Sequence, residues 1–218
     1  MNWPDDYINQ IICGDCRDVM KGMPDERLVI ITDPVWPNVH PNLIGLENSF
    51  VLFARAAKHF PRIAKRVIIQ LGCDSDPRFL FGIPAALEFK RVVSLRYARP
   101  SYHGRLLRDR DMAYIFGDLP QSRPGLRVMP GEFTHTKHNA FKPEHPCPRQ
   151  LSHVKWLVSK YTEEDDIILD PFAGAGTTGV AAFLLDRKYI CIEIEKRFCE
   201  EAERYLVRAA EQLKLALK

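Results

Sequence analysis

Two short apolar segments near opposite ends of the chain are each stopped by an Asp-Pro pair. Asp33-Pro34-Val35-Trp36 follows the apolar run over 28–31, and the block Asp-Pro-Phe-Ala-Gly-Ala-Gly-Thr-Thr over 170–178 follows the run over 166–169. Proline lacks a backbone N–H and is excluded from the centre of a sheet, so each pair predicts the end of a strand. The two runs therefore predict buried strands that each end in a polar loop.

Strand and helix patterns alternate along the rest of the 218 residues. Apolar runs predict further strands over 8–12, 67–71, 92–97, 112–116 and 189–192. Helical spacing predicts helices over 50–60 (ended by Pro61), 151–161, 177–185 and 196–217. The alternation predicts an α/β fold, a mixed and mostly parallel sheet with helices on both faces and one antiparallel hairpin. With 46% hydrophobic residues, the chain can bury the core of a single domain, 1–218.

Composition argues against secretion and membrane insertion. Residues 1–6 are acidic where a signal peptide is basic, and no apolar run approaches the roughly 18 residues that a membrane helix needs. Six cysteines without a framework spacing are typical of reduced thiols in a cytoplasm. We predict no metal, because neither candidate cluster has a regular ligand spacing; the clusters are Cys13 with Cys16, and His135, His138 and His145 with Cys147.

Positive charge is concentrated in one segment. Residues 90–110 hold seven Lys and Arg against one Asp, a net charge of +6 in a chain whose total is +3. Tyr97 and Tyr102 lie among these arginines, a combination that suits a phosphate backbone and unstacked bases, although a solvated hairpin face has the same pattern. The proline-rich stretch 117–148 has almost no periodicity and predicts a long structured loop. We take 96–148 as the candidate DNA-recognition region, with Arg96, Arg99, Arg105, Arg108, Arg110 and Lys137 as DNA contacts.

The C-terminal block predicts a cradle for a nucleotide-like cofactor. Gly174 and Gly176 let the backbone turn tightly between a strand and a helix, and the N–H groups at the start of that helix can meet polar ligand atoms. Glu193 follows Asp170 by 23 residues, at the end of the next strand, where a carboxylate can accept hydrogen bonds from ribose hydroxyls. The glycines also fit a dinucleotide pattern, but fewer than 40 residues follow Gly179, too few for the rest of a dehydrogenase sheet.

These blocks resemble the motifs of the amino-methylating DNA methyltransferases. The segment 170–178 is similar to the S-adenosylmethionine loop of that family, D-P-F-x-G-S-G-T-T, and 189–195 resembles its ribose-binding strand. Gly14-Asp15-Cys16 resembles its G-D-S/C step, and 145–149 its H-P-x-x-K/R segment. The resemblance implies a Rossmann-like, circularly permuted fold of the β class, because the catalytic block comes first. The cofactor residues that it implies are Asp15, His145, Arg149, Asp170, Phe172, Ala173, Gly174, Gly176, Thr177, Thr178 and Glu193.

The N-terminal block resembles the catalytic motif D/N/S-P-P-Y/F/W of the same family. The resemblance implies that Asp33 and the Pro34 carbonyl accept the protons of an exocyclic amine, and that Trp36 stacks on a target base flipped out of double-stranded DNA. Aspartate at the first position favours N6 of adenine over N4 of cytosine. Val35 replaces the second proline, and this departure leaves open a catalytically inactive subunit that binds S-adenosylmethionine or nucleic acid.

Motif order also bears on other methyltransferase classes. Pro146-Cys147 is similar to the nucleophile of the C5-cytosine enzymes, but there it follows the glycine loop and here it precedes it. RNA amino-methyltransferases usually carry the cofactor block first. The resemblance therefore implies a DNA methyltransferase of a restriction-modification system, encoded by a bacterium or a phage. It also implies a cytoplasmic location and suggests a homodimer.

Overall fold

The computed structural model describes residues 2–35, 49–121, 128–134 and 149–216. Within these residues, eight strands form one sheet in the order β1-β8-β7-β2-β3-β5-β4-β6. The strands from β1 to β3 in that order are parallel, β5 is antiparallel to both of its neighbours, and β6 is parallel to β4. The bounds are β1 Gln10–Cys13, β2 Leu28–Thr32, β3 Ala64–Gly72, β4 Phe89–His103, β5 Leu106–Gly117, β6 Glu132–Thr134, β7 Ile167–Asp170 and β8 Lys188–Glu193.

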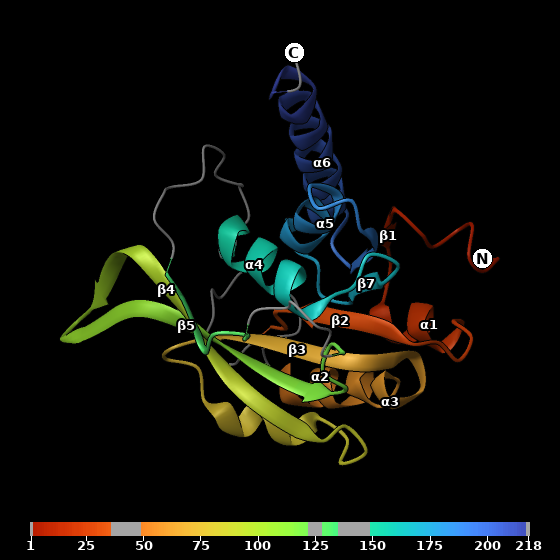
Figure 1. The fold of residues 1–218 in the computed structure, drawn as a ribbon. Coiled ribbons are helices and arrows are strands. Elements are labelled where there is room, and N and C mark those ends of the chain that lie inside the picture. The colour runs from red at the N-terminus through yellow and green to blue at the C-terminus, as the bar shows by residue number, and fades with distance from the viewer. Residues whose placement is uncertain (1, 36–48, 122–127, 135–148, 217–218) are drawn as a thin grey trace.

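Helices cover both faces of the sheet (Figure 1). One face packs against α1 (Cys16–Lys21), α2 (Ser49–Ala57), α3 (Phe60–Ile63) and the 3-10 helix η2 (Pro77–Gly82). The other face packs against α4 (Leu151–Tyr161), α5 (Thr177–Phe183) and α6 (Lys196–Ala216). Alternate residues of a strand point to opposite faces, so Leu28 and Ile30 join the first core and Val29 and Ile31 the second. The predicted mixed sheet with helices on both faces is confirmed.

The structure differs from the sequence predictions mainly in short elements. The helices α1, α3 and η2 and the strand β6 have at most six residues each, too few for a repeating pattern to identify them in the sequence. Pro61 does not simply end a helix, because it occupies the first turn of α3, where its missing N–H costs nothing. β6 lies inside the stretch predicted to be a loop and pairs with β4 from Ser94 to Arg96. Among the described residues, no helix has the length and apolar character needed to cross a membrane.

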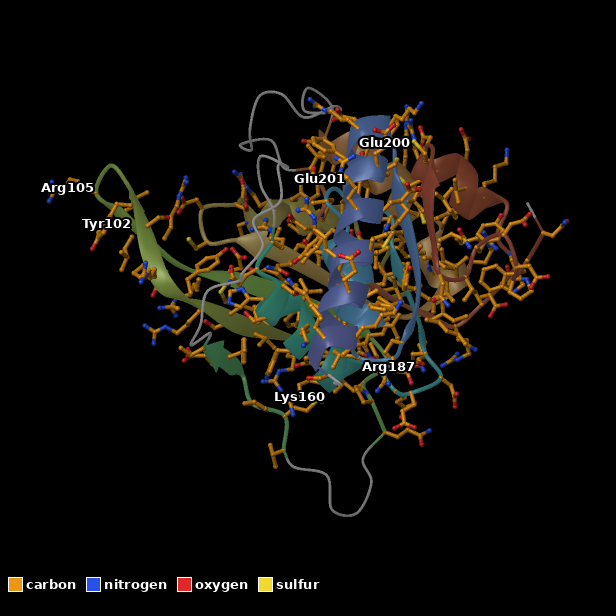
Figure 2. All side chains as sticks on the ribbon, turned by 90° about the horizontal axis from the view of Figure 1, so that it is seen from above. Tyr102, Arg105, Lys160, Arg187, Glu200 and Glu201 are labelled. Carbon is orange, nitrogen blue, oxygen red and sulfur yellow. The ribbon has the colours of Figure 1, made fainter. Side chains whose placement is uncertain are left out.

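The antiparallel hairpin is much longer than predicted. β4 and β5 pair from Phe89 opposite Phe116 to His103 opposite Leu106, with an irregularity between Arg96 and Ser101. Beyond that irregularity the hairpin extends past the helical layers as an arm, residues 97–110 (Figure 1). Figure 2 shows Tyr102 and Arg105 at its outer end. The strands predicted from the sequence stop too early, because the side chains of the arm do not alternate between apolar and polar as they do in a strand with one buried face.

The topology fixes where a ligand can bind. β7 and β2 are adjacent and parallel, with Ile168 opposite Val29. The chain continues from β7 to β8 on one side of the pair and from β2 to β3 on the other. Open α/β sheets bind ligands outside the carboxyl ends of strands at such a switch point. Both Asp-Pro loops begin at this point.

Candidate active site

An open pocket of about 680 Å³ lies at the carboxyl ends of β2 and β7. From β2 it is lined by Asp33, Pro34 and Val35, and from the arm by Arg99, Arg108 and Arg110. The predicted cofactor residues that line it are Asp15, Arg149, Asp170, Phe172, Ala173, Gly174, Thr177, Thr178 and Glu193. The structure thus brings the two Asp-Pro blocks into one cavity, although 137 positions separate their aspartates.

Other predicted site residues lie elsewhere. Trp36, Lys137 and His145 are outside the described residues, as is Pro146-Cys147. Gly176 is the N-cap of α5 and packs against α6 at Ala202. Arg96 and Arg105 do not line the pocket, and Arg105 is exposed at the tip of the arm.

Asp170 shapes the cofactor loop from inside. Its Oδ1 accepts hydrogen bonds from the Thr32 hydroxyl at 2.6 Å and from the Phe172 N–H at 3.1 Å, so one carboxylate joins β2 to the turn after β7. Burial raises the pKa of Asp170 to about 6, although hydrogen bonds from Thr178, Thr32 and the Phe172 N–H favour the ionised form. The ionised Asp170 carboxylate therefore holds the loop through these hydrogen bonds, but burying its charge away from water is unfavourable.

This desolvation predicts a pH-dependent stability difference. The pKa of Asp170 is raised to about 6 in the folded chain from an ordinary 3.8, so the folded state holds this proton more tightly than the unfolded state does. The contribution of Asp170 to the free energy of unfolding therefore falls as pH rises from about 4 to above 6, by on the order of 3 kcal/mol. Asp170→Asn removes this loss, so we expect the variant to exceed wild type in stability near neutral pH but not near pH 4.

Urea unfolding of both proteins across that pH range measures the difference directly. Asp118→Asn is the control, because Asp118 is exposed and pairs only at the surface with Arg27. A gap between Asp170→Asn and wild type that stays constant with pH would contradict the prediction.

Glu193 holds the glycine loop against β8. Its Oε2 accepts the Gly174 N–H at 2.8 Å and its Oε1 accepts the Glu195 N–H at 2.8 Å. Burial raises the pKa of Glu193, while these backbone bonds favour its charged form. A carboxylate has about four acceptor positions, so two remain for donors from a ligand in the pocket. The residue can thus shape the loop and accept ligand hydroxyls at the same time.

Glu193→Gln is expected to weaken S-adenosylmethionine binding about 10-fold or more, equivalent to at least about 1.4 kcal/mol. The amide turns an NH₂ group toward the Gly174 or Glu195 N–H and also gives up the charge that strengthens bonds to ligand hydroxyls. Isothermal titration calorimetry gives the dissociation constant, and Glu200→Gln on the exposed side of α6 serves as the control. Unchanged affinity in Glu193→Gln would remove Glu193 from the cofactor site.

Asp15 begins α1 at the edge of the same pocket. As the N-cap it accepts the Arg17 N–H at 2.9 Å, and it forms an ion pair with the Arg17 guanidinium. The hydrogen bond from the Arg17 side chain is the main cause that lowers the pKa of Asp15. The Gly14 N–H donates to the Glu193 carbonyl at 2.8 Å, which ties the start of α1 to the end of β8.

Asp33 is paired with Arg149, a residue that the sequence motif assigned to the cofactor. Arg149 donates Nε to Asp33 Oδ2 and Nη2 to Oδ1, each at 2.6 Å. Its Nη1 lies 3.2 Å from both carboxylate oxygens of Asp111 on β5. The contact of Arg149 with a cofactor stays a prediction, and the structure adds a link to the catalytic motif.

Sequence reasoning missed Asp111 and Gln70, and it named Tyr97 only as an aromatic side chain for unstacked bases, not as a partner of Asp111. Gln70 donates to Asp111 Oδ2 at 2.8 Å, and the Tyr97 hydroxyl donates to the same oxygen at 2.6 Å. A signal was present, since Asp111 precedes the buried Ala113 and Ile115 at a spacing of two. Strand periodicity therefore placed this carboxylate on an inward face, where a charge needs partners.

Three arginines in the arm or next to it are partly neutralised by nearby acids. Arg108 pairs with Asp74, Arg110 pairs with Asp109 at 2.7 Å, and Arg96 lies 3.7 Å from Asp109 and 3.9 Å from Glu132. These side chains are between 38% and 45% exposed, so their cationic groups stay accessible. Within the described part of the chain, no group of three or more His, Cys, Asp or Glu is placed to hold a metal ion.

Comparison with known proteins agrees with this geometry. M2.MboI, a type II methyltransferase of Moraxella bovis, is 48% identical over 61 residues, a match that spans 28% of this chain but only 22% of that protein. The crystal structure of an M1.HpyAVI–SAM complex superposes with a TM-score of 0.69 at 22% identity, covering 90% of this chain and 98% of that one. The PvuII cytosine-N4-specific DNA methyltransferase superposes with a TM-score of 0.68 at 14% identity, covering 91% and 88%.

Both superpositions establish the fold, which is that of the S-adenosylmethionine-dependent methyltransferases. The DNA methylase family profile, which covers the N6 and N4 enzymes, matches residues 31–204. That range holds both Asp-Pro blocks, the arm and most of the sheet. The chain therefore belongs to the DNA methylase family of N6 and N4 amino-methyltransferases.

Proposed function

We propose that this chain is a site-specific DNA methyltransferase that transfers the methyl group of S-adenosylmethionine to N6 of adenine. One observation carries the proposal: Asp33 and the loop after Asp170 open into the same pocket at the carboxyl ends of adjacent parallel strands. A methyl donor held by that loop and an amine held by Asp33 would therefore share one cavity. Holding two reactants together in this way is a large part of catalysis for such a transfer.

The pocket residues suit the cofactor. A volume of about 680 Å³ falls in the range of roughly 300–1,000 Å³ typical of small-molecule sites. Carboxylates of Asp15 and Glu193 at its edge match the hydroxyl and amino donors of S-adenosylmethionine, and the apolar Phe172 and Phe198 offer surfaces for its adenine. When bound, this cofactor supplies a methyl group on a positively charged sulfur, which a neutral amine can attack.

The residues of the catalytic block supply acceptors for the target amine. The lone pair of an exocyclic amine is delocalised into the base, so the amine is a poor nucleophile until its N–H groups are held by acceptors. The Asp33 carboxylate and the Pro34 carbonyl are the acceptors that we assign to it, and Trp36 is the residue that we expect to stack on the base. A base inside a duplex cannot reach this pocket, so the substrate is double-stranded DNA with the target base flipped out.

N4 of cytosine is the second candidate target. The family covers both amines, and the superposable PvuII enzyme is cytosine-N4-specific. Aspartate at position 33 is the feature that favours adenine. The arginines of the arm, together with the rest of 96–148, are our candidates for DNA recognition. A recognition region this small also motivates a homodimer, and a bacterial or phage-infected cytoplasm is the compartment that we propose.

The test uses purified protein, S-adenosylmethionine and unmethylated bacterial DNA, followed by digestion and mass spectrometry of the nucleosides. N6-methyladenine supports the proposal, and N4-methylcytosine moves the target to the second candidate. If neither forms although calorimetry detects cofactor binding, the inactive-subunit alternative raised by Val35 takes its place. If the protein does not bind S-adenosylmethionine, the proposed activity and the inactive-subunit alternative are both rejected, because each requires the pocket to hold this cofactor.

A further inference from the structure

Asp111 is a buried residue that Arg149 connects to Asp33, and it belongs to none of the motifs named above. It lies on β5 with 2% of its surface exposed. Hydrogen bonds from Gln70 on β3 and from Tyr97 on β4 hold Oδ2 from two sides. Three adjacent strands therefore fix this carboxylate, and fixed strands position a group more closely than a loop does.

Arg149 connects this fixed carboxylate to Asp33. Its guanidinium is planar and offers donors on two edges, so one edge binds both oxygens of Asp33 while Nη1 binds Asp111. Asp33 lies just past the end of β2 in a loop whose third residue, Val35, lacks the stiffening of a second proline. The hydrogen bonds from Arg149, rather than a stiff loop, thus set the orientation of the Asp33 carboxylate.

We propose that Asp111 is a positioning residue that orients Asp33 through Arg149 for the incoming amine; the inference rests on the proposed methyl transfer. Arg149 donates one hydrogen bond to each oxygen of Asp33. Two bonds to one carboxylate restrain its rotation and so fix the direction in which Asp33 faces the target amine.

Charge provides the second reason for the arrangement. Asp33, Asp111 and Asp170 are three of the acidic residues that line the pocket. Burial, above all, raises the pKa of Asp170, and the charge of Asp33 adds to the effect. Burial by itself would lower the pKa of Arg149, but the charges of Asp111 and Asp33 raise it well above its ordinary value. The guanidinium of Arg149 therefore places a permanent positive charge between the carboxylates of Asp33 and Asp111.

Asp111→Asn tests the role while preserving side-chain shape. We expect kcat under saturating DNA and cofactor to fall about 10- to 100-fold, the scale on which small misplacements of a reacting group act. The dissociation constants for S-adenosylmethionine and for DNA should change less than about twofold, because only 2% of Asp111 is exposed and its oxygens already bind protein donors. Asp166→Asn is the matched control: that carboxylate is also buried and ion-paired, to Lys65 at 2.5 Å, but does not line the pocket.

A double-mutant cycle tests whether Asp111 acts through Arg149. Arg149→Lys keeps the charge but loses the two-edged contact, so Asp111→Asn should lower kcat less than about twofold further in that background. Tyr97→Phe removes only one hydrogen bond to Asp111, and we expect a smaller fall in kcat with the cofactor affinity unchanged. This milder variant keeps the test informative if Asp111→Asn folds poorly.

The outcomes separate this inference from the proposed function. If wild-type protein forms no methylated base, the proposed function fails and the inference fails with it. If wild type is active and both Asp111→Asn and Tyr97→Phe retain its kcat, only the inference is overturned. A fall in kcat that comes with an equal loss of cofactor affinity also overturns it, because Asp111 would then act on cofactor binding. A fall that adds fully to the effect of Arg149→Lys overturns it as well, because Asp111 would then act independently of Arg149.

Discussion

Asp33→Ala is expected to lower the rate of methyl transfer by about 10³-fold, the upper range for removing one group that stabilises developing charge in a transition state. In the proposed mechanism the Asp33 carboxylate is the charged acceptor for the target amine, and the Pro34 carbonyl alone would leave one N–H without a charged partner. Single-turnover incorporation of labelled methyl into DNA measures the effect. Cofactor affinity should stay within about threefold, because the loop proposed to hold the cofactor lies between β7 and α5 and is held by Asp170 and Glu193 rather than by Asp33.

The variant should also fold. Arg149 keeps its contact with both oxygens of Asp111, so removing Asp33 does not leave a buried guanidinium without an acceptor. Asp118→Ala is the control for a generic loss of a carboxylate, since Asp118 lies at the surface with Arg27. Activity retained in Asp33→Ala would remove the catalytic role of the Asp-Pro block, whichever base the enzyme methylates.

Gly176→Ala is expected to reduce the free energy of unfolding by about 3–4 kcal/mol, equivalent to a fall in Tm of roughly 6–16 °C for a chain of this size. Gly176 has φ +76°, a left-handed conformation that costs an L-residue about 1–2 kcal/mol. A Cβ there would also lie 2.6 Å from the Ala202 Cβ and 3.1 Å from its Cα. Because those contacts involve the backbone of α6, the helix must shift away from the loop.

Gly104 offers a matched control for the steric part. Its φ of +58° is also left-handed, but an added Cβ would meet nothing within 4 Å. Gly104→Ala should therefore lose only about 1–2 kcal/mol, the conformational cost alone. Thermal unfolding of the two variants compares them directly. Equal losses would mean that the approach of α6 to the cofactor loop does not depend on glycine at position 176.

Local patterns anticipated most of the sheet. The helix predicted over 151–161 agrees with α4 at both ends, and the strands at the two Asp-Pro blocks are present within one residue at each end. Such agreement arises because apolar periodicity and proline act over a few neighbouring residues. The hairpin was underestimated, since exposed Tyr102, Leu106 and Leu107 continue it without a buried face.

The sequence by itself determined the α/β class, the order of the two blocks and the loop at the carboxyl end of each strand, because these depend on local periodicity and turn residues. Only the tertiary structure decided the partners of the charges. Arg149 meets Asp33 across 116 positions, and Gln70 meets Asp111 across 41. No local pattern specifies such pairs, because each depends on strand order and register, which bring β2, β3 and β5 together. The setting of the Asp33 carboxylate is therefore a property of the assembled sheet.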